Sequence, residues 1–416
     1  MHLLLPEVDL CALPLAEREE TARRLATEEA HRAMDLEQGP VVRASLLKLG
    51  ADDHVLLLTL HHIVADGWSL GVLSRELTTL YGAYTRGEAS PLGELLVQYA
   101  DFSAWQRQWL AGEVLERQIS YWKRCLTGAP TLQLPTDRPR PAVSTYRGAN
   151  HYFVVKSELA EGLKTLGLRE GATLFMVLLT GFKALLCRYS GQEDVVVGSP
   201  IANRHRHEIE GLIGFFVNSL ALRTDLSGDL TFKEALGRVR ETALGAYDHQ
   251  DLPFEKLVEE LQPERDLSRN PLFQANFALQ NAPLTALDLG ELRVRSFGID
   301  AAATRFDLEL NAWAKGGGGL GAAFIYSTDL FDASTIERMT GHLLTLLEAA
   351  VAEPERPLSE LALLSSAEKK ALAIDWNATD TTWPTPTFVH HAFEGQAKRA
   401  PDRVACRHGR WQGGPG

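Results

Sequence analysis

The chain has 416 residues, of which 45% are hydrophobic and 23% charged, and these proportions are ordinary for a globular protein of two or three domains. Its formal net charge of -12 argues against a nucleic acid as partner, because phosphate binding needs a basic face and no basic cluster stands out. The N-terminal MHLLLPEVDL lacks the basic region of a signal peptide, and no stretch is apolar for long enough to predict a membrane span.

The first predicted elements are a charge-rich helix at Leu15–Met34 and two apolar strands at Val41–Leu49 and Val55–Leu60. The short ADD turn between the two strands predicts that they pair as a hairpin. The second strand is almost continuously apolar, with β-branched members, and this composition predicts burial on both of its faces.

A histidine pair, His61 and His62, stands at the end of this hairpin, before the turn signal Asp66-Gly67 and a helix with Ser69 as its predicted N-cap. Successive side chains of a strand point to opposite sides, so only one imidazole can face a given cavity. One histidine is therefore a candidate for chemistry, since a neutral imidazole can accept a proton, and the other for scaffolding. The alternatives at this point are a purely structural pair and a metal site that includes Asp66, although no third ligand with metal spacing follows.

The next region, Tyr99–Leu126, is predicted to be helical, with an aromatic stripe typical of helix packing. The proline-rich Leu134–Thr145 has no periodicity and is predicted to be a linker between subdomains. Alternating strands and helices then predict α/β sandwiches, two of them for this length. The expected elements are a strand at Asn150–Val155, helices at Leu159–Leu166 and Thr173–Tyr189, and a buried strand at Asp194–Pro200.

Three dense motifs follow: IGFFVNSLALR at Ile213–Arg223, HQDLPFE at His249–Glu255 and RDLSRNPL at Arg265–Leu272. The first contains a strand-like apolar run that is typical of a protein core. Asn218 and Arg223 lie within that run, so the amide and the guanidinium must find hydrogen-bond partners there.

The four cysteines, Cys11, Cys125, Cys187 and Cys406, are scattered without CxxC spacing. This pattern is typical of reduced thiols rather than of a disulfide framework or a zinc site. We therefore predict a cytoplasmic protein without a bound metal.

These motifs, together with HHIVADGWS at 61–69 and YADFSAW at 99–105, resemble the motif series of the condensation domains of nonribosomal peptide synthetases. The family forms are HHxxxDG, YxDYAxW, IGxFVNTxxxR, HQDxPFE and RDxSRNPL, and HHxxxDG is shared with chloramphenicol acetyltransferase-like acyltransferases. The five motifs stand in the family's order, and the resemblance covers roughly Leu5 to Leu364.

The resemblance implies an α/β fold of two chloramphenicol acetyltransferase-like α/β sandwich subdomains in a V shape. We expect an N-terminal subdomain over residues 1–135, a C-terminal subdomain over residues 136–364 and a linker over residues 365–387. Residues 388–416 resemble the start of an adenylation domain. Two motifs that family members carry before the region of Leu5, similar to SxAQxR and RHExLR, are not in this sequence, so we expect the first subdomain to be incomplete.

The residues that match the family's motifs receive roles from the resemblance. His62 matches the active-site histidine, acting either as general base or as positioner of an amine. His61 and Asp66 are expected to form the scaffold, with Arg204 as the ion-pair partner of Asp66. Gly67 is expected to permit the turn and the close approach of a substrate arm. The region of Asn218 and Arg223 is implied to clamp the two subdomains together above the active-site tunnel.

The implied reaction is amide formation between an aminoacyl group on a downstream carrier protein and the thioester on an upstream one. The implied partners are these donor and acceptor carrier proteins and an adjacent adenylation domain. The carriers supply the phosphopantetheine arms, so we expect no cofactor bound to this chain. Alternatives are a non-catalytic interaction domain, an acyltransferase for a soluble alcohol or amine, and an epimerising variant.

Overall fold

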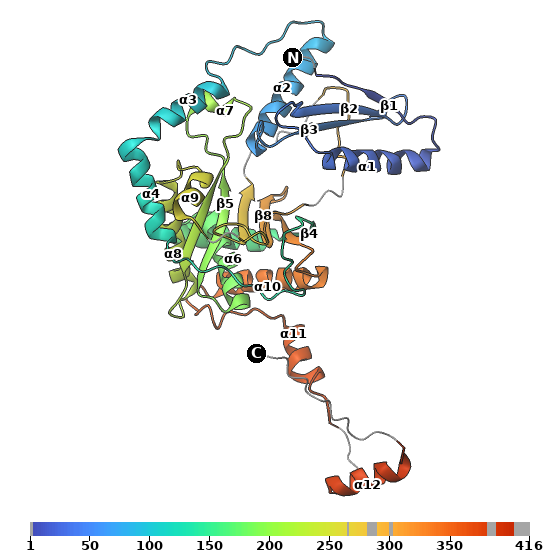
Figure 1. The fold of residues 1–416 in the computed structure, drawn as a ribbon, viewed down its shortest axis with the longest axis vertical. Coiled ribbons are helices and arrows are strands. Elements are labelled where there is room, and N and C mark those ends of the chain that lie inside the picture. Colours follow the sequence, from blue (N-terminus) through green and yellow to red (C-terminus); the bar gives the residue numbers. More distant parts are fainter. Residues whose placement is uncertain (1–2, 264–265, 281–288, 299–302, 381–387, 403–416) are drawn as a thin grey trace, which may run out of the picture. The chain divides into compact units, whose positions relative to one another are not determined.

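A computed structural model describes residues 3–263, 266–280, 289–298, 303–380 and 388–402 (Figure 1). The chain divides into two compact units, Met1–Leu363 and Leu364–Gly416. The first unit contains two β-sheets and most of the helices, and this mixed architecture confirms the predicted α/β fold class.

The smaller sheet has three strands in the order β1-β2-β3, with β1 parallel to β2 and β2 antiparallel to β3. The predicted hairpin is confirmed, because Val42 pairs with Leu60 and Lys48 pairs with His54. Figure 1 shows the first helix, α1, lying along one face of this sheet. The bounds are β1 Glu7–Asp9, α1 Leu15–His31, β2 Val42–Lys48 and β3 His54–Leu60. A small core between helix and sheet contains Leu10, Ala22, Leu47, Leu49 and Val55.

The prediction that the second strand of this hairpin is buried on both faces is wrong. Val55 is buried against α1, whereas Leu56 and Leu58 on the opposite face are 46% and 38% exposed. The apolar run predicts a strand, but the run cannot show whether a second layer covers it. The expectation that the first subdomain is incomplete stays a prediction.

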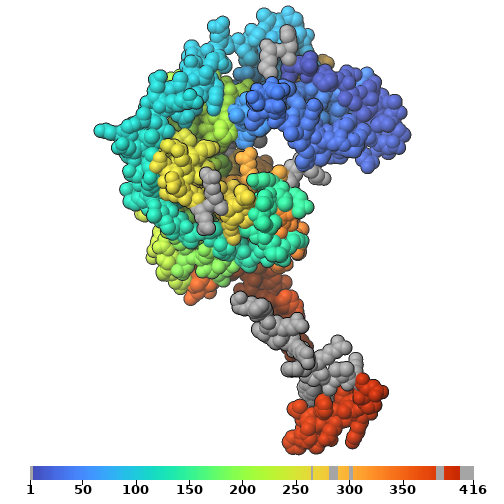
Figure 2. All heavy atoms as spheres, viewed as in Figure 1, coloured from blue at the N-terminus to red at the C-terminus, as the bar shows by residue number. Residues whose placement is uncertain are grey.

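A segment before β8, residues 289–298, contacts α1 and the small core. Phe297 packs against the small core, and its ring lies 4.9 Å from the guanidinium carbon of Arg23. Arg23 also donates a hydrogen bond of 2.6 Å to the carbonyl of Gly298. On the face shown in Figure 2, the surface is hollowed between the blue N-terminal residues and the residues around the larger sheet.

The larger sheet has six strands in the order β4-β9-β8-β7-β5-β6, in which β5, β7 and β8 run parallel and the other pairs are antiparallel. Four helices, α5, α6, α8 and α10, pack together with the apolar face of this sheet. The strand bounds are β4 Gly148–Val155, β5 Asp194–Ile201, β6 Asn218–Asp225, β7 Ala275–Gln280, β8 Leu308–Ala314 and β9 Leu320–Ser327. The helix bounds are α5 Ser157–Arg169, α6 Leu174–Ser190, α8 Phe232–Tyr247 and α10 Ala333–Ala352.

The central helix α6 begins at a capping box on Thr173 and ends at Gly191, whose φ of 70° is typical of a left-handed C-terminal residue. It carries one charged group into the core. Lys183 is completely buried, and its Nζ donates to the carbonyl of Leu222 at 2.6 Å and to the hydroxyl of Thr224 at 2.7 Å. This ammonium therefore joins α6 to the edge strand β6.

The predicted helical region Tyr99–Leu126 consists of two helices, α3 (Tyr99–Trp109) and α4 (Gly112–Leu126). Trp122 and Leu126 of α4, with Leu132 beyond it, are buried in the core of the larger sheet. The segment Leu134–Thr145, which was predicted to be a linker, is held against the larger sheet. The guanidinium of Arg140 in this segment pairs with the carboxylate of Asp307, directly before β8. The remaining helices of the first unit are α2 Gly67–Thr85, α7 His207–Glu210 and α9 Phe254–Leu261.

The second unit contains α11 (Ser366–Lys370), a π-helical turn at Ala371–Asp375 and α12 (Val389–Arg399). Its large apolar side chains are exposed, including Trp376 at 72% and Phe393 at 60%. Residues 403–416, which include Cys406 and the end of the segment that resembles the start of an adenylation domain, lie outside the described residues.

Candidate active site

The candidate active site begins where β3 ends. His62 lies in the turn after β3, where its side chain is exposed and its Nδ1 is 2.7 Å from the carbonyl oxygen of Ala65. Because a carbonyl only accepts hydrogen bonds, Nδ1 must carry the proton. In the neutral imidazole, Nε2 then holds the lone pair and can accept a proton or a hydrogen bond.

The neighbouring histidine has a different environment. His61 is half-buried, and its Nδ1 accepts a hydrogen bond of 3.1 Å from the backbone amide of Ile63. This contact closes the turn locally and uses the nitrogen lone pair that a base would need. His62 therefore has a lone pair available at Nε2, whereas His61 supports the turn.

Asp66 is the N-cap of α2, and it is 4% exposed. Its carboxylate accepts hydrogen bonds from the amide and hydroxyl of Ser69, at 2.8 and 2.7 Å, and from the amide of Phe216, at 3.0 Å. Burial by itself raises the pKa of the Asp66 carboxyl, but the bonds from Ser69, the Arg204 guanidinium and the Phe216 amide together lower that pKa below its ordinary value. Ser69, predicted as the N-cap, instead lies in the first turn of the helix.

The ion pair predicted between Asp66 and Arg204 is present, with a distance of 3.1 Å between Nη2 and Oδ1 and side-chain exposures of 1% and 2% for the arginine and the aspartate. Arg204 also donates to the carbonyls of Ile209 and Leu212, at 2.6 and 2.8 Å. Its guanidinium carbon lies 4.0 Å from the ring centroid of Phe216. Burial lowers the pKa of Arg204, and the ion pair with Asp66 opposes that shift. The pair faces protein rather than solvent, as expected of a scaffold.

Gly67 does not play the conformational part that the sequence suggests. Its φ lies outside the left-handed region, and a Cβ placed on it would meet no atom within 4 Å. The turn therefore tolerates a side chain here, and only the predicted approach of a substrate arm would require a small residue.

The segment between α7 and β6 is the main part of the site that sequence reasoning missed. The run from Phe215 was expected to be strand, but β6 begins only at Asn218. The preceding residues instead bind the start of α2, because the amide of Gly214 donates to the hydroxyl of Ser69 at 3.1 Å. The ring of Phe215 packs against His62, with centroids 5.1 Å apart and planes at 89°.

Tyr99 of α3 completes this arrangement. Its hydroxyl donates a hydrogen bond of 2.7 Å to the carbonyl of Phe215. A Cβ on Gly214 would lie 2.3 Å from a ring carbon of Tyr99, so this close approach requires glycine. The spacing of aromatic residues in α3 predicted helix packing, and nothing in that pattern indicated a bond to the distant segment.

The two other predicted residues lie farther along β6. Asn218 donates to the carbonyls of Gln250 and Leu252, both at 2.8 Å, and thereby holds the loop before α9. Arg223 pairs with Asp194 at 2.7 Å and donates to the carbonyl of Cys125 at the carboxyl end of α4. Both groups have the partners that their surroundings require, while their part in clamping the subdomains stays a prediction.

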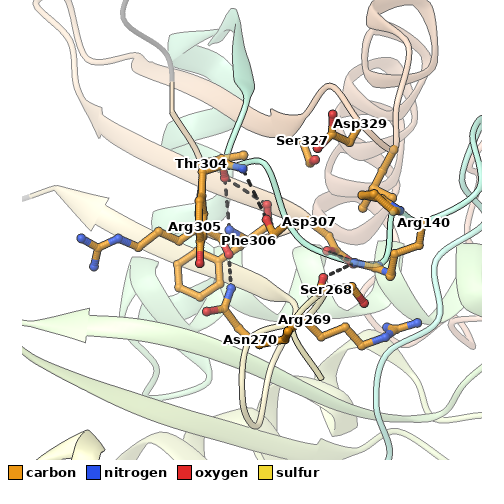
Figure 3. A pocket seen from close by; sticks show the side chains of 15 residues that line it. Arg140, Ser268, Arg269, Asn270, Thr304, Arg305, Phe306, Asp307, Ser327 and Asp329 are labelled. Atoms are coloured by element: carbon orange, nitrogen blue, oxygen red, sulfur yellow. Dashed lines mark hydrogen bonds and ion pairs between the residues drawn. The ribbon is translucent and has the colours of Figure 1, made fainter. Parts of the chain in front are cut away.

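Figure 3 shows a polar pocket that lies elsewhere. Arg140, Arg269 and Asp307 contribute to its lining, where β8 begins and β9 ends. The loop of Arg204 instead follows the carboxyl end of β5, which runs parallel to β7 and β8. The cavity measures about 30 Å³ and is too small for a peptidyl substrate.

Within the described ranges, no three His, Cys, Asp or Glu residues lie close enough together to bind a metal ion. Among these residues no single helix is long and apolar enough to cross a membrane, although α5 and α6, bent by 106° at their junction, pass that test as a pair on length and composition.

A buried aspartate–arginine pair holds the start of α2, and the turn before it presents the Nε2 of His62, which can act as a general base in acyl transfer. The family model of the Condensation domain matches residues 7–373, and the chain belongs to this family. In nonribosomal peptide synthetases, domains of this family catalyse amide-bond formation.

Known relatives support the assignment. A linear gramicidin synthase from Brevibacillus parabrevis is 52% identical over 404 residues, which cover 96% of this chain and 5% of that protein. Among solved structures, the X-domain from teicoplanin biosynthesis is 29% identical with a TM-score of 0.77, covering 88% of this chain and 82% of that one. The first condensation domain of the calcium-dependent antibiotic synthetase shares the fold, with a TM-score of 0.68, 23% identity and coverage of 87% and 78%.

Proposed function

We propose that this chain forms a peptide bond between two carrier-bound substrates in nonribosomal peptide synthesis. The observation that carries the proposal is the imidazole of His62: its Nδ1 is bonded to Ala65, and its Nε2 has no hydrogen-bond partner among the described residues, so the lone pair can accept a proton from an amine. The chain spans only 5% of the relative to which it is 52% identical, so the substrates and partners belong to the proposal as well.

The proposed reaction joins an acceptor amine to a donor thioester. The nitrogen of the carrier-bound aminoacyl group attacks the thioester carbonyl carbon, the C–N bond forms, and the C–S bond breaks. The proton lost by the amine passes to Nε2 of His62 and then to the departing thiolate of the donor phosphopantetheine. An amine attacks a thioester readily once the two are aligned, so positioning and proton removal are the contributions asked of the protein.

The proposed partners are an upstream donor carrier and a downstream acceptor carrier, each bringing its own phosphopantetheine arm, and an adjacent adenylation domain. The resemblance of residues 388–416 to the start of such a domain supports the last partner. A synthetase of this kind is expected in the cytoplasm, where its carriers are loaded.

The remaining site residues are proposed to act through His62. Asp66 and Arg204 hold the start of α2 and the segment of residues 214–216 in one arrangement, and His61 supports the turn. The buried bonds of Asp66 and Arg204, with the local bond of His61, are proposed to fix the backbone from which the imidazole projects.

The experiment is a condensation assay of His62→Ala in the module that contains this chain, with both carriers loaded. We expect a loss of about 10²- to 10⁴-fold in the rate of amide formation, the usual contribution of a general base. His61→Ala is the matched control and should act mainly by lowering the melting temperature. Near-normal product from His62→Ala would contradict the assignment, as would an equal loss from His61→Ala at an unchanged melting temperature.

A further inference from the structure

The orientation of the His62 imidazole depends on a residue from another part of the chain. Within its own turn, the ring is held through Nδ1 by the carbonyl of Ala65. That single bond leaves the ring exposed and free to tilt about it. The edge-to-face contact with Phe215, at 5.1 Å and 89°, restrains the ring from a second direction.

Phe215 can act as a restraint because the backbone on both sides of it is fixed. The amide of Phe216 donates to Asp66, and the amide of Gly214 donates to the hydroxyl of Ser69. The hydrogen bond from Tyr99 then fixes the carbonyl of Phe215 itself.

Tyr99 is suited to this task by its surroundings. Its ring packs edge-to-face on Phe216, with centroids 5.1 Å apart, and it lies against Gly214, where no side chain could fit. Burial raises the pKa of the Tyr99 hydroxyl, so the hydroxyl keeps its proton and remains a donor at neutral pH.

We propose that Tyr99 and Phe215 are positioning residues for the reaction: Tyr99 fixes the backbone of Phe215, and the ring of Phe215 sets the direction in which Nε2 of His62 points. The inference rests on the proposed function for its catalytic meaning. The contacts from Tyr99 to Phe215 and from Phe215 to the imidazole are observed whatever the function is. Misplacement of a reacting group by about 1 Å can cost a hundredfold in rate.

The kinetic test uses Phe215→Leu and Tyr99→Phe in the complete module with loaded carriers. We expect kcat to fall about tenfold or more in each, with KM changed by less than about twofold, because alignment is lost while substrate contacts remain. Phe215→Tyr keeps the ring and should recover most of the rate. The double variant should be less impaired than independent effects would predict, because both changes act through the same ring.

Phe102→Leu is the matched control. Phe102 belongs to the same aromatic cluster and contacts Tyr99 and Phe216, but no contact joins it to His62 among the described residues. It should lower the melting temperature without the selective loss of kcat. If Phe102→Leu reproduces the kinetic pattern of Phe215→Leu, or if Phe215→Tyr fails to recover activity, the two residues act through general packing and the proposal is wrong.

A second readout does not depend on activity. With ¹⁵N-labelled histidine, and His62→Asn to assign the signals, the shifts of the two ring nitrogens report which one carries the proton. We expect the proton on Nδ1 in the parent protein and averaged shifts in Phe215→Leu and Tyr99→Phe. If the shifts change in the variants but the parent protein has no condensation activity, Tyr99 and Phe215 still orient His62 and the proposed function is wrong. Unchanged shifts and unchanged kcat in an active protein would overturn the link alone.

Discussion

Replacement of Asp66 by alanine tests the scaffold most directly. The substitution removes the acceptor of four hydrogen bonds: two from Ser69, one from the amide of Phe216 and one from Arg204. It also leaves the guanidinium of Arg204, with 1% of its side chain exposed, without a counter-charge.

The expected cost follows from that stranded charge. Removing one partner of a buried ion pair typically destabilises a protein by about 3–5 kcal/mol. An unfolding entropy near 2.1 cal/(mol K) per residue gives about 0.8 kcal/(mol K) for the 363 residues of the first unit. The melting temperature of Asp66→Ala should therefore fall by about 4–7 °C, and activity should fall with it.

The assay is thermal unfolding followed by circular dichroism, with condensation activity measured on the same preparations. Because the folded-state pKa of Asp66 is lowered, its contribution is complete above the ordinary pKa of about 3.9 and is lost as the pH falls through the lowered value. The difference in melting temperature between the parent and Asp66→Ala should therefore be complete at pH 7 and become smaller in strong acid. Asp52→Ala, an exposed change in the β2–β3 turn, should stay within about 0.5 kcal/mol of the parent.

A further variant separates the stranded charge from the lost bonds. Asp66→Ala combined with Arg204→Met removes both charges, and it should be less destabilised than Asp66→Ala alone. An Asp66→Ala protein that melts at the parent temperature but makes no product would refute this reasoning, because it would place Asp66 in the chemistry rather than the scaffold.

Three other outcomes are expected. Burial lowers the pKa of Lys183 to about 7, below its value in the unfolded chain, so the free energy of unfolding should rise between about pH 7 and pH 10 in the parent and rise less in Lys183→Met. An equal rise in the two proteins, measured by urea unfolding at each pH, would contradict the lowered pKa. Asn218→Ala leaves the carbonyls of Gln250 and Leu252 without this donor, and it should cost about 1–3 kcal/mol and raise hydrogen exchange in residues 250–254. Limited proteolysis should cleave within residues 376–380 or 388–402, where large apolar side chains are exposed, long before β3; protection of α12 equal to that of β3 would contradict this expectation.

The sequence was most informative where a single element explains the pattern. The hairpin before His61 is predicted by two apolar runs that a short turn separates, and the structure confirms it. The bond between Asp66 and Arg204 follows from the need of buried charges for partners, together with the family resemblance. In both cases the residue types themselves restrict the possible structures.

The remainder of the site depends on hydrogen bonds of backbone atoms, and these bonds do not restrict which residue type occupies the position. The amide of Phe216 donates to Asp66 and the carbonyl of Phe215 accepts from Tyr99, and any residue could supply those groups. Exposure of Leu56 and Leu58 was missed for a related reason, because burial of a strand face depends on what lies over it. Only Gly214 carries a trace of the contact, since a side chain there would collide with Tyr99.

The bonds between the histidine turn, α3 and residues 204–216 also limit how such domains can be recombined. A chimera with its junction between Tyr99 and Arg204 takes the start of α2 and α3 from one parent and the segment that binds them from another. Any mismatch at Gly214 or Tyr99 would then arise at a contact between residues more than a hundred positions apart in the sequence. Engineers who exchange parts of these synthetases would keep residues 61–216 together, even though the sheets suggest a boundary inside that range.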